Sequence, residues 1–355
     1  EVFGLFRDDY ILSRNDPLIK VRGEVFQKIY AVKPLVSKTT NIPFLFVDAG
    51  FKQYQLDVAV FEVVQIGGLI RDENGKLHDL REYLNIQPVE SLLVYSSRVR
   101  KGDEYSFRVE LRSFTDRSII CSDRSCRDVN TGLGDALKDV VSYGGRTRNP
   151  RFFTKLAGYI EGLLELAYGL IVRKMLKDSV GLNPILVIDG SLIRWFSIRR
   201  SRASVDGLDI LGVLTRIDKN TLQSELYSVV GLAKSTKFTT IARSYSLFRE
   251  QTRLAGRGFY TIINKDGVAY VQGVLSDLLS KYALRDYVDE TIKIFNRIVY
   301  DVNDIYVVRF PVTSDYSNIY VLDLYTPKPI IMIDRFNLTV NTDVIDDVNK
   351  RVSEI

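Results

Sequence analysis

Histidine and cysteine are scarce in this chain, whose 355 residues include one histidine and two cysteines. A Ser-His-Asp or Cys-His enzyme needs a histidine base, and the sole histidine, His78, lies in a polar segment, so both classes are nearly excluded. A zinc site needs more ligands than His78, Cys121 and Cys126 provide. Any chemistry must therefore use carboxylates, lysines, tyrosines or a bound metal.

Long apolar runs are also lacking. The longest, such as residues 184–188, have the length of a strand and fall far short of the roughly 20 residues that cross a bilayer. The first residues mix charge into every apolar stretch, unlike a secretory leader. We therefore expect a cytoplasmic protein with no membrane partner, in which Cys121 and Cys126 are free thiols. A local disulfide is the alternative, because intracellular proteins of hyperthermophiles carry them.

Positive charge is in small excess, with 49 Lys and Arg against 44 Asp and Glu. That excess alone does not establish a nucleic-acid partner, but basic and aromatic side chains are interleaved in the second half of the chain. Such stretches suit a phosphate backbone with stacked bases, although solvated helix faces produce similar runs. The residues are Arg194, Arg199, Arg200 and Arg202, followed by Arg243, Arg249, Arg253 and Arg257 with Tyr245, Phe248 and Phe259.

Hydrophobic periodicity predicts an α/β protein. Apolar residues at three- and four-residue steps predict a long helix over 151–177, and helical periodicity recurs over 275–295. Strands, a long helix and a further strand indicate a mixed sheet flanked by helices. The predicted strands are 44–47, 58–70, 105–114, 185–188, 226–232, 305–310 and 319–324.

No shift in composition marks a domain boundary. We therefore expect a single domain over 1–355, with its core at roughly 41–335 and a helical segment at 1–40. A turn is predicted at residues 72–75, and the glycine-containing polar stretch 115–149 is predicted to be a connecting region.

Acidic residues follow two of the predicted strands. Asp48 stands in Val-Asp-Ala-Gly and Asp189 in Ile-Asp-Gly-Ser, and the small residues leave room for the backbone of another molecule. A carboxylate at such a position is unfavourable unless it is paired or coordinated, although Asp-Gly is also a common turn. Glu161 and Glu165 lie four residues apart on one side of the helix between these strands. A solvated helix stripe is their alternative interpretation.

The order strand acid, helix acid, strand acid is that of the ligands in RNase H-like nucleases. Hard oxygen ligands there hold two magnesium or manganese ions. The ions lie roughly 3.5–4 Å apart and bind the attacking and leaving oxygens of a phosphodiester. No histidine or cysteine is required, which fits this composition. The sequence therefore predicts an RNase H-like mixed sheet with Mn²⁺ or Mg²⁺ as cofactor.

The chain resembles the archaeal NurA nucleases in several motifs. Residues 47–50 are similar to the family's Val-Asp-Gly-Ser motif, with Ala49 in place of the glycine, and residues 187–192 resemble its Asp-Gly-Ser-Leu motif. Residues 229–235 resemble a strand that ends in a lysine, and residues 307–329 resemble the C-terminal strand pair and proline turn of the family.

The resemblance implies a 5′–3′ exonuclease and single-strand endonuclease acting on DNA. It also implies a role in DNA-end resection and double-strand-break repair, a homodimer, and a hexameric HerA-type ATPase as partner. Metal ligands would be Asp48, Asp189 and either Glu165, whose spacing from Asp189 is closer to the family's, or Glu161. Lys234 would contact the scissile phosphate or stabilise developing charge, and Arg194, Arg199 and Arg200 would follow the DNA backbone.

The C-terminal segment departs from the family pattern of a tyrosine and, eight residues on, a histidine. Tyr325, expected to contact DNA, stands one residue out of register, and Asp334 stands near the place of the histidine. Asp334 either forms an ion pair or a helix N-cap, or replaces the histidine as a catalytic group. These changes and Ala49 motivate an alternative function, a non-catalytic DNA-binding or scaffold subunit of the same ATPase complex.

Overall fold

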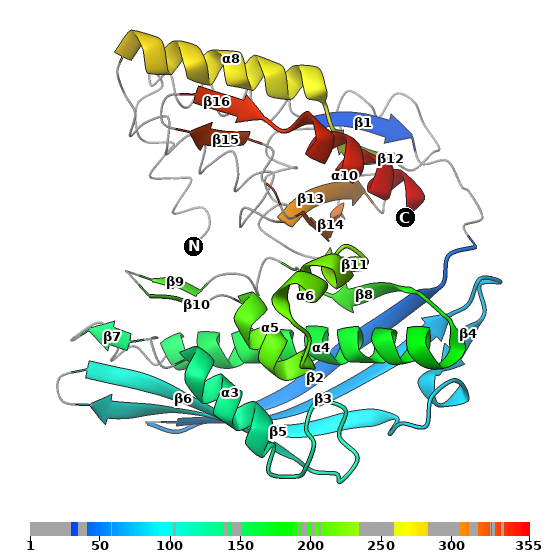
Figure 1. Ribbon diagram of the computed structural model, residues 1–355, viewed down its shortest axis with the longest axis vertical. Helices are drawn as coiled ribbons and strands as arrows, with labels where there is room; N and C mark the ends of the chain where they lie inside the picture. The colour runs from blue at the N-terminus through cyan, green and yellow to red at the C-terminus, as the bar shows by residue number, and fades with distance from the viewer. Residues whose placement is uncertain are drawn as a thin grey trace. The chain divides into compact units, whose positions relative to one another are not determined.

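The computed structural model divides into two compact units, Asn41–Val230 and the combination of Glu1–Thr40 with Gly231–Ile355. Each unit is described by itself (Figure 1). The structure describes residues 30–34, 41–57, 59–101, 104–137, 141–143, 151–190, 192, 198–200, 203–205, 207–233, 259–282, 305–311, 319–326, 328, 331–334 and 337–355.

A mixed sheet forms the first unit. Its strand order is β11-β8-β2-β3-β5-β6-β7, with the short β4 paired to β3. Strands β2, β3, β5 and β6 form an antiparallel meander, whereas β8 runs parallel to β2. The strands are β2 (Phe44–Gln55), β3 (Ala59–Arg71), β4 (Leu77–Asp79), β5 (Val89–Lys101), β6 (Glu104–Ser113), β7 (Val141–Tyr143), β8 (Ile185–Asp189) and β11 (Val229–Ala233).

The two faces of this sheet differ in burial. On one face, called the inner face here, alternate residues such as Leu45, Val64, Leu92, Leu111 and Leu186 are fully buried. Residues of the opposite parity point to the other face, called the outer face, because successive strand residues alternate between the two sides. Most side chains there are half-buried or exposed, with Phe44, Ala59 and Ser97 as buried exceptions, which follows from the distribution of the helices.

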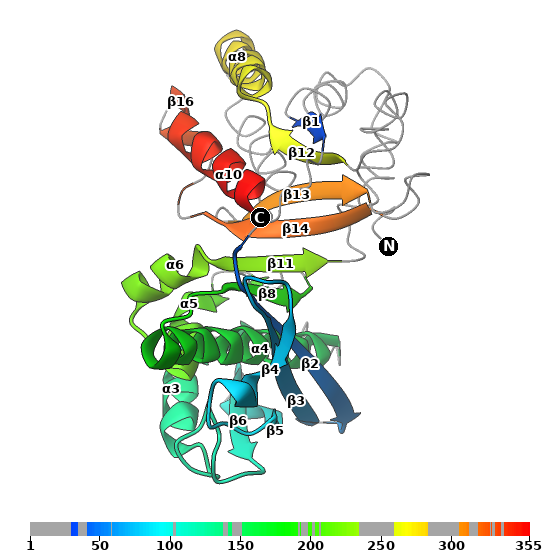
Figure 2. The same cartoon turned by 90° about the vertical axis from the view of Figure 1, so that its right-hand side faces the viewer.

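Helices of the first unit pack on the inner face (Figures 1 and 2). The long helix α4 (Arg151–Val180) contacts β2, β3, β5 and β8, and α5 (Gly207–Thr215) packs against α4. Helix α3 (Arg127–Leu137) contacts β6 and α5, and α6 (Lys219–Leu226) is capped by Asp218, whose carboxylate accepts from two backbone N–H groups. Almost every residue from Tyr159 to Leu170 is buried, because α4 lies between the sheet and α5.

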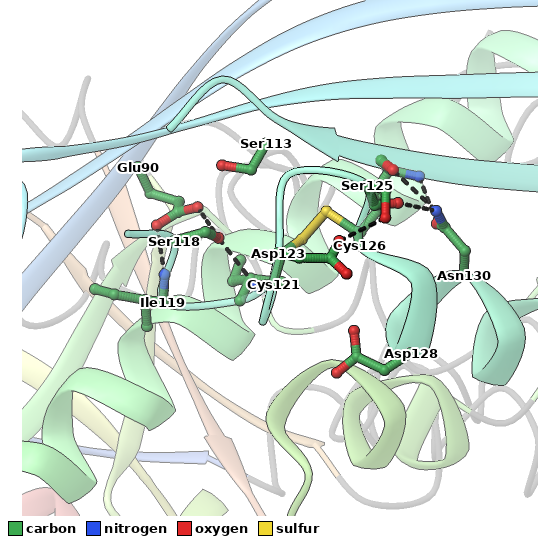
Figure 3. The surroundings of a disulfide bond; sticks show 12 residues. Glu90, Ser113, Ser118, Ile119, Cys121, Asp123, Ser125, Cys126, Asp128 and Asn130 are labelled. Carbon is green, nitrogen blue, oxygen red and sulfur yellow. Dashed lines mark hydrogen bonds between the residues drawn. A yellow bond between two sulfur atoms is a disulfide. The ribbon is translucent and has the colours of Figure 1, made fainter. Parts of the chain in front are cut away.

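The connection from β6 to α3 holds a disulfide between Cys121 and Cys126 (Figure 3). The expectation of two free thiols is therefore wrong. The chain turns back on itself at Cys126, which has a φ of 48°, so that the two Cα atoms come within 4.8 Å. Asn130 anchors the turn, since its side chain donates to the carbonyls of Leu111 and Ser125.

Within the described residues, the second unit has three antiparallel strand pairs and two helices. Its ion pair between Lys265 and Asp346, at 2.6 Å, links α8 (Lys265–Tyr282) to α10 (Thr342–Glu354). The pairs are β1 (Tyr30–Pro34) with β12 (Phe259–Ile263), β13 (Ile305–Pro311) with β14 (Ile319–Tyr325), and β15 (Ile331–Asp334) with β16 (Asn337–Val340). None of the helices that the structure describes is long and apolar enough to cross a membrane.

The prediction of a mixed α/β sheet flanked by helices is confirmed, as are the long helix, the 72–75 turn and the late strand pair. The connecting region predicted at 115–149 is wrong in part, because it contains α3 and β7. Within the predicted helical segment 1–40, the described part is strand β1, and the rest lies outside the described residues. The single domain over 1–355 stays a prediction.

Candidate active site

Asp48 and Asp189 lie on neighbouring parallel strands. The register of β2 and β8 pairs Phe46 with Val187 and Val47 with Ile188, so one further step places Asp48 beside Asp189. Neighbouring strands are roughly 4.8 Å apart, and residues at the same level point to the same side. Since Val47 and Ile188 are buried on the inner face, both carboxylates belong to the outer face, and both residues are exposed.

Glycines surround this pair of carboxylates. Gly67 pairs with Asp48 across β2 and β3, and Gly50 follows two residues later on the same face. A Cβ at Gly50 would meet no atom within 4 Å, and one at Gly67 would meet only the Pro88 carbonyl at 3.7 Å. Gly190, with φ at 121°, adopts a backbone conformation that favours glycine. The outer face is therefore open next to Asp48.

The position of Glu165 follows from two contacts of α4 with the start of β8. Arg173 Nε donates to the Pro184 carbonyl at 2.7 Å, and a Cβ on Gly169 would lie 2.7 Å from the Leu186 side chain. Four helix residues and two strand residues both span roughly 6 Å. One more step places Glu165 at the level of Ile188, buried on the inner side, with 6% of its surface exposed.

Glu161 lies one helical turn before Glu165 and is half-buried. The strand acids thus lie on the outer face, whereas the helix acids come from the inner side. Among the described residues, no group of three or more His, Cys, Asp or Glu side chains is placed to hold a metal ion. The two strand acids are brought together, and the expected cluster of three is not formed in this structure.

Several predicted DNA-contacting residues lie at the edge of what the structure describes. Lys234 and Arg194 lie outside the described residues. Arg199 and Arg200 lie in β9 (Ile198–Arg200), which pairs with β10 (Ala203–Val205) in a short hairpin. Their roles stay predictions.

Tyr325 and Asp334 belong to the second unit. Tyr325 ends β14, its carbonyl accepts from Arg351 Nη1 at 2.7 Å, and its surface is 1% exposed. A base could reach this ring only after a rearrangement, so its DNA contact stays a prediction. Asp334 ends β15 and pairs with Asn337 of β16. Since a strand follows, the helix N-cap interpretation of Asp334 is wrong, while its ion-pair and catalytic interpretations stay predictions.

Two buried carboxylates on the inner face were not identified from the sequence. Glu90 is satisfied, since it accepts from Ser118 Oγ and from the Ile119 backbone N–H at 2.8 Å (Figure 3). Among the described residues, Glu62 has one long contact, 3.5 Å from Gln53 Nε2, and its Oε2 has no hydrogen-bond partner. Burial raises the pKa of Glu62 to about 7. In the sequence, Glu62 alternates with the apolar residues Val60 and Val64 of one strand face. This alternation is the signal that could have identified Glu62 as a buried carboxyl.

Comparisons with known proteins give weak likenesses. No family model matches the chain, and no curated protein matches it. The crystal structure of the NurA nuclease from Sulfolobus solfataricus is similar at 10% identity and a TM-score of 0.30, covering 100% of this chain and 84% of that chain. NurA bound to dAMP and manganese is similar at 12% identity and a TM-score of 0.24, covering 98% of this chain and 87% of that chain. Likenesses at these TM-scores do not establish a common fold.

Proposed function

We propose that this chain is a divalent-metal-dependent nuclease that hydrolyses DNA. The observation that carries the proposal is the pair Asp48 and Asp189, side by side on parallel strands and exposed on an open, glycine-rich face. Two carboxylates of like charge at neighbouring positions repel each other unless a cation lies between them. Carboxylate oxygens are the ligands that magnesium and manganese prefer.

The strand order supports an RNase H-like assignment of the first unit. The chain forms the antiparallel strands β2, β3 and β5, later the long helix α4, and then β8 parallel to β2. The acids Asp48, Glu165 and Asp189 fall on the first strand, the helix and the returning strand, in the order that the resemblance to NurA nucleases implies.

In this proposal, Asp48 and Asp189 hold the metal from the outer face. A bound ion would neutralise charge on the phosphodiester and lower the pKa of a water molecule. The open surface at Gly50 and Gly67 would let the sugar-phosphate backbone approach Asp48. The resemblance assigns the third carboxylate to Glu165, with Glu161 as the alternative, and phosphate contacts to Lys234, Arg194, Arg199 and Arg200. Because both helix acids come from the inner side, either one could join the strand acids only after a rearrangement.

The finer parts of the proposal come from the resemblance to the NurA family. They comprise 5′–3′ exonuclease and single-strand endonuclease activity, DNA-end resection in double-strand-break repair, and Mn²⁺ or Mg²⁺ as the ion. A homodimer, a HerA-type hexameric ATPase as partner and a cytoplasmic location complete it. Light scattering at micromolar concentration tests the dimer, and a monomer alone would contradict it.

Substitution of the strand acids tests the proposal. Asp48→Asn and Asp189→Asn keep the side-chain shape and remove a charged ligand, so cleavage of labelled DNA with Mn²⁺ should fall about a hundredfold or more. Because both residues are exposed, the melting temperature should stay near that of the wild type. Asp135→Asn, an exposed acid on α3, is the matched control and should cleave normally. Near wild-type cleavage by either strand variant would reject the metal site.

The helix acids are separated by the same assay. Glu165→Gln should reduce cleavage strongly and shift the Mn²⁺ dependence of the remaining activity to higher concentration, whereas Glu161→Gln should leave both unchanged. The reverse result would assign the third ligand to Glu161.

The second candidate function is a non-catalytic DNA-binding or scaffold subunit of the same ATPase complex. The observation that favours it is that the described acids do not form a group of three able to hold a metal. An enzyme should lose cleavage on chelation and regain it with manganese. A scaffold would bind DNA and never cut it under any divalent metal.

A further inference from the structure

Beyond Asp48, the outer face of β2, β3 and β5 continues as ordered rows of side chains. The register places Gly50 beside Gln65, then Lys52 beside Val63, and then Tyr54 beside Phe61. Strand β5 extends the last two rows with Leu93 and Tyr95. Directly opposed residues point to the same side, and rows follow one another at roughly 7 Å along the strands. A surface thus leads from the acidic pair toward the tip of the β2–β3 hairpin.

The row of Tyr54 is aromatic on β2, β3 and β5, and the half-buried acid Glu110 of β6 ends it. The rings of Phe61 and Tyr95 lie 4.9 Å apart between centroids, and Tyr54 is 52% exposed. Exposed aromatic groups that form a continuous patch mark binding surfaces more often than isolated apolar side chains do. The described helices of this unit that pack on the sheet lie on its other, inner side (Figure 2).

A cation accompanies the aromatic row. Lys52 Nζ lies 5.5 Å from the ring centroid of Tyr54, and Lys52 makes no ion pair within the described part of the chain. Arg112 of β6 lies beside Leu93, in the same row as Lys52, and is also exposed. Lysine is depleted from the centres of protein–protein interfaces. Aromatic planes interleaved with cations instead match stacked bases and phosphates.

We propose that Lys52, Tyr54, Phe61 and Tyr95 form a binding track for single-stranded nucleic acid. The nucleic-acid strand would run from the Asp48–Asp189 pair across Gly50. One of its phosphates would bind Lys52, and its bases would stack on the aromatic row. The track rests on the proposed function only for what happens at Asp48, because binding along it requires neither a metal nor cleavage.

Binding without cleavage tests the track. Fluorescence anisotropy of labelled oligothymidine on the full chain in EDTA measures the Kd. Base stacking on an aromatic side chain contributes roughly 1–3 kcal/mol, so Tyr54→Ala should raise the Kd about tenfold. Lys52→Ala removes one phosphate contact and should lower the slope of log K against log salt by about 0.7. Melting temperatures should not change, because both side chains are exposed.

Matched controls come from the helical side of the same unit. Lys174→Ala on α4 and Tyr227→Ala after α6 remove an exposed cation and a 37% exposed tyrosine away from the track. Both should bind oligothymidine like the wild type. Equal losses in the control and track variants would indicate nonspecific electrostatics and would overturn the track.

The remaining outcomes separate the track from the nuclease. Unchanged DNA binding by Tyr54→Ala and Lys52→Ala overturns the track, even if the protein cuts DNA with manganese. Unchanged DNA binding together with a loss of self-association in light scattering assigns the face to a second copy of the chain, which also overturns the track. Weakened binding by these variants in a protein that never cuts DNA supports the track and rejects the nuclease.

Discussion

The two faces of the β2–β3 hairpin contain the same kinds of residue in opposite surroundings. On the inner face, Glu62 is 0% exposed and has a raised pKa, and on the outer face Asp48 is exposed beside glycines. The inner face packs against α4 and provides stability, whereas the outer face leaves side chains and space for other molecules. Stability and binding therefore depend on alternate residues of the same strands, so substitutions can separate them.

The largest change in stability should come from Glu62, the carboxyl on the inner face. Glu62 has a folded-state pKa of about 7, above its ordinary value of 4.5. The folded protein thus holds this proton more tightly than the unfolded chain. The resulting stabilisation is complete below pH ~4.5 and is lost as the pH rises through about 7, an effect of about 3 kcal/mol. Glu62→Gln should therefore gain stability relative to the wild type between pH 5 and pH 8, measured by urea unfolding.

Glu90→Gln is the matched control for Glu62. Glu90 is equally buried, and burial also raises its pKa, but the hydrogen bonds from Ser118 and Ile119 oppose that rise. Glu90→Gln should therefore gain less stability at pH 8 than Glu62→Gln, because it also loses these hydrogen bonds to a charged acceptor. If Glu62→Gln gains no more stability than Glu90→Gln at that pH, Glu62 is not an unsatisfied carboxyl and the contrast between the two faces fails.

A smaller effect is expected from glycine substitutions on the two sides of the sheet. The methyl group of Gly169→Ala would lie 2.7 Å from a terminal atom of Leu186, which is fully buried. Overpacking costs about 1–3 kcal/mol and the higher helix propensity of alanine offsets about 1 kcal/mol, so we expect a net loss of up to about 2 kcal/mol. Gly50→Ala meets no atom within 4 Å and should be neutral or slightly stabilising. Equal losses in urea unfolding would show that the outer face is packed after all.

The smallest change in stability should come from the sheet edge, where His78 joins the half-buried Asp72 and the exposed Glu82. Its Nδ1 lies 2.8 Å from Glu82 and its Nε2 lies 3.1 Å from Asp72, and these hydrogen bonds, with Glu82 first, raise the pKa of His78. The stabilisation is complete below the unfolded pKa near 6.5 and is lost as the pH rises through the higher folded pKa. NMR titration of this sole histidine measures its pKa directly. A value at or below that of the unfolded chain would contradict the hydrogen bonds of His78 to Glu82 and Asp72.

Strongly periodic segments were predictable from the sequence. The long helix and the β3, β6 and β8 strands have apolar patterns that their burial repeats. Helix α3 was missed because Gly132 and Gly134 suggested a loop. Gly132 is needed for packing, since a Cβ there would lie 2.6 Å from Val213 of α5. That contact depends on residues far apart in the chain, which local patterns do not reveal.

The candidate site was predictable only in part, for a similar reason. Asp48 and Asp189 were found because each follows an apolar run, but their adjacency depends on the parallel pairing of β2 with β8. Lys52 and Tyr54 were missed because the strand was predicted to end at Asp48, whereas β2 continues to Gln55. The alternation of Phe46, Asp48, Gly50, Lys52 and Tyr54 along one face was the available signal.

The buried disulfide makes the redox history of a sample part of its experimental conditions. Cys121 is 3% exposed and Cys126 is fully buried, so a reductant can attack the sulfurs only when the β6–α3 connection opens. The rate of thiol release in dithiothreitol therefore measures how often that segment opens. Protein stored with reductant would differ from protein stored without it in the β6–α3 connection. The two preparations are therefore not interchangeable in any comparison of stability.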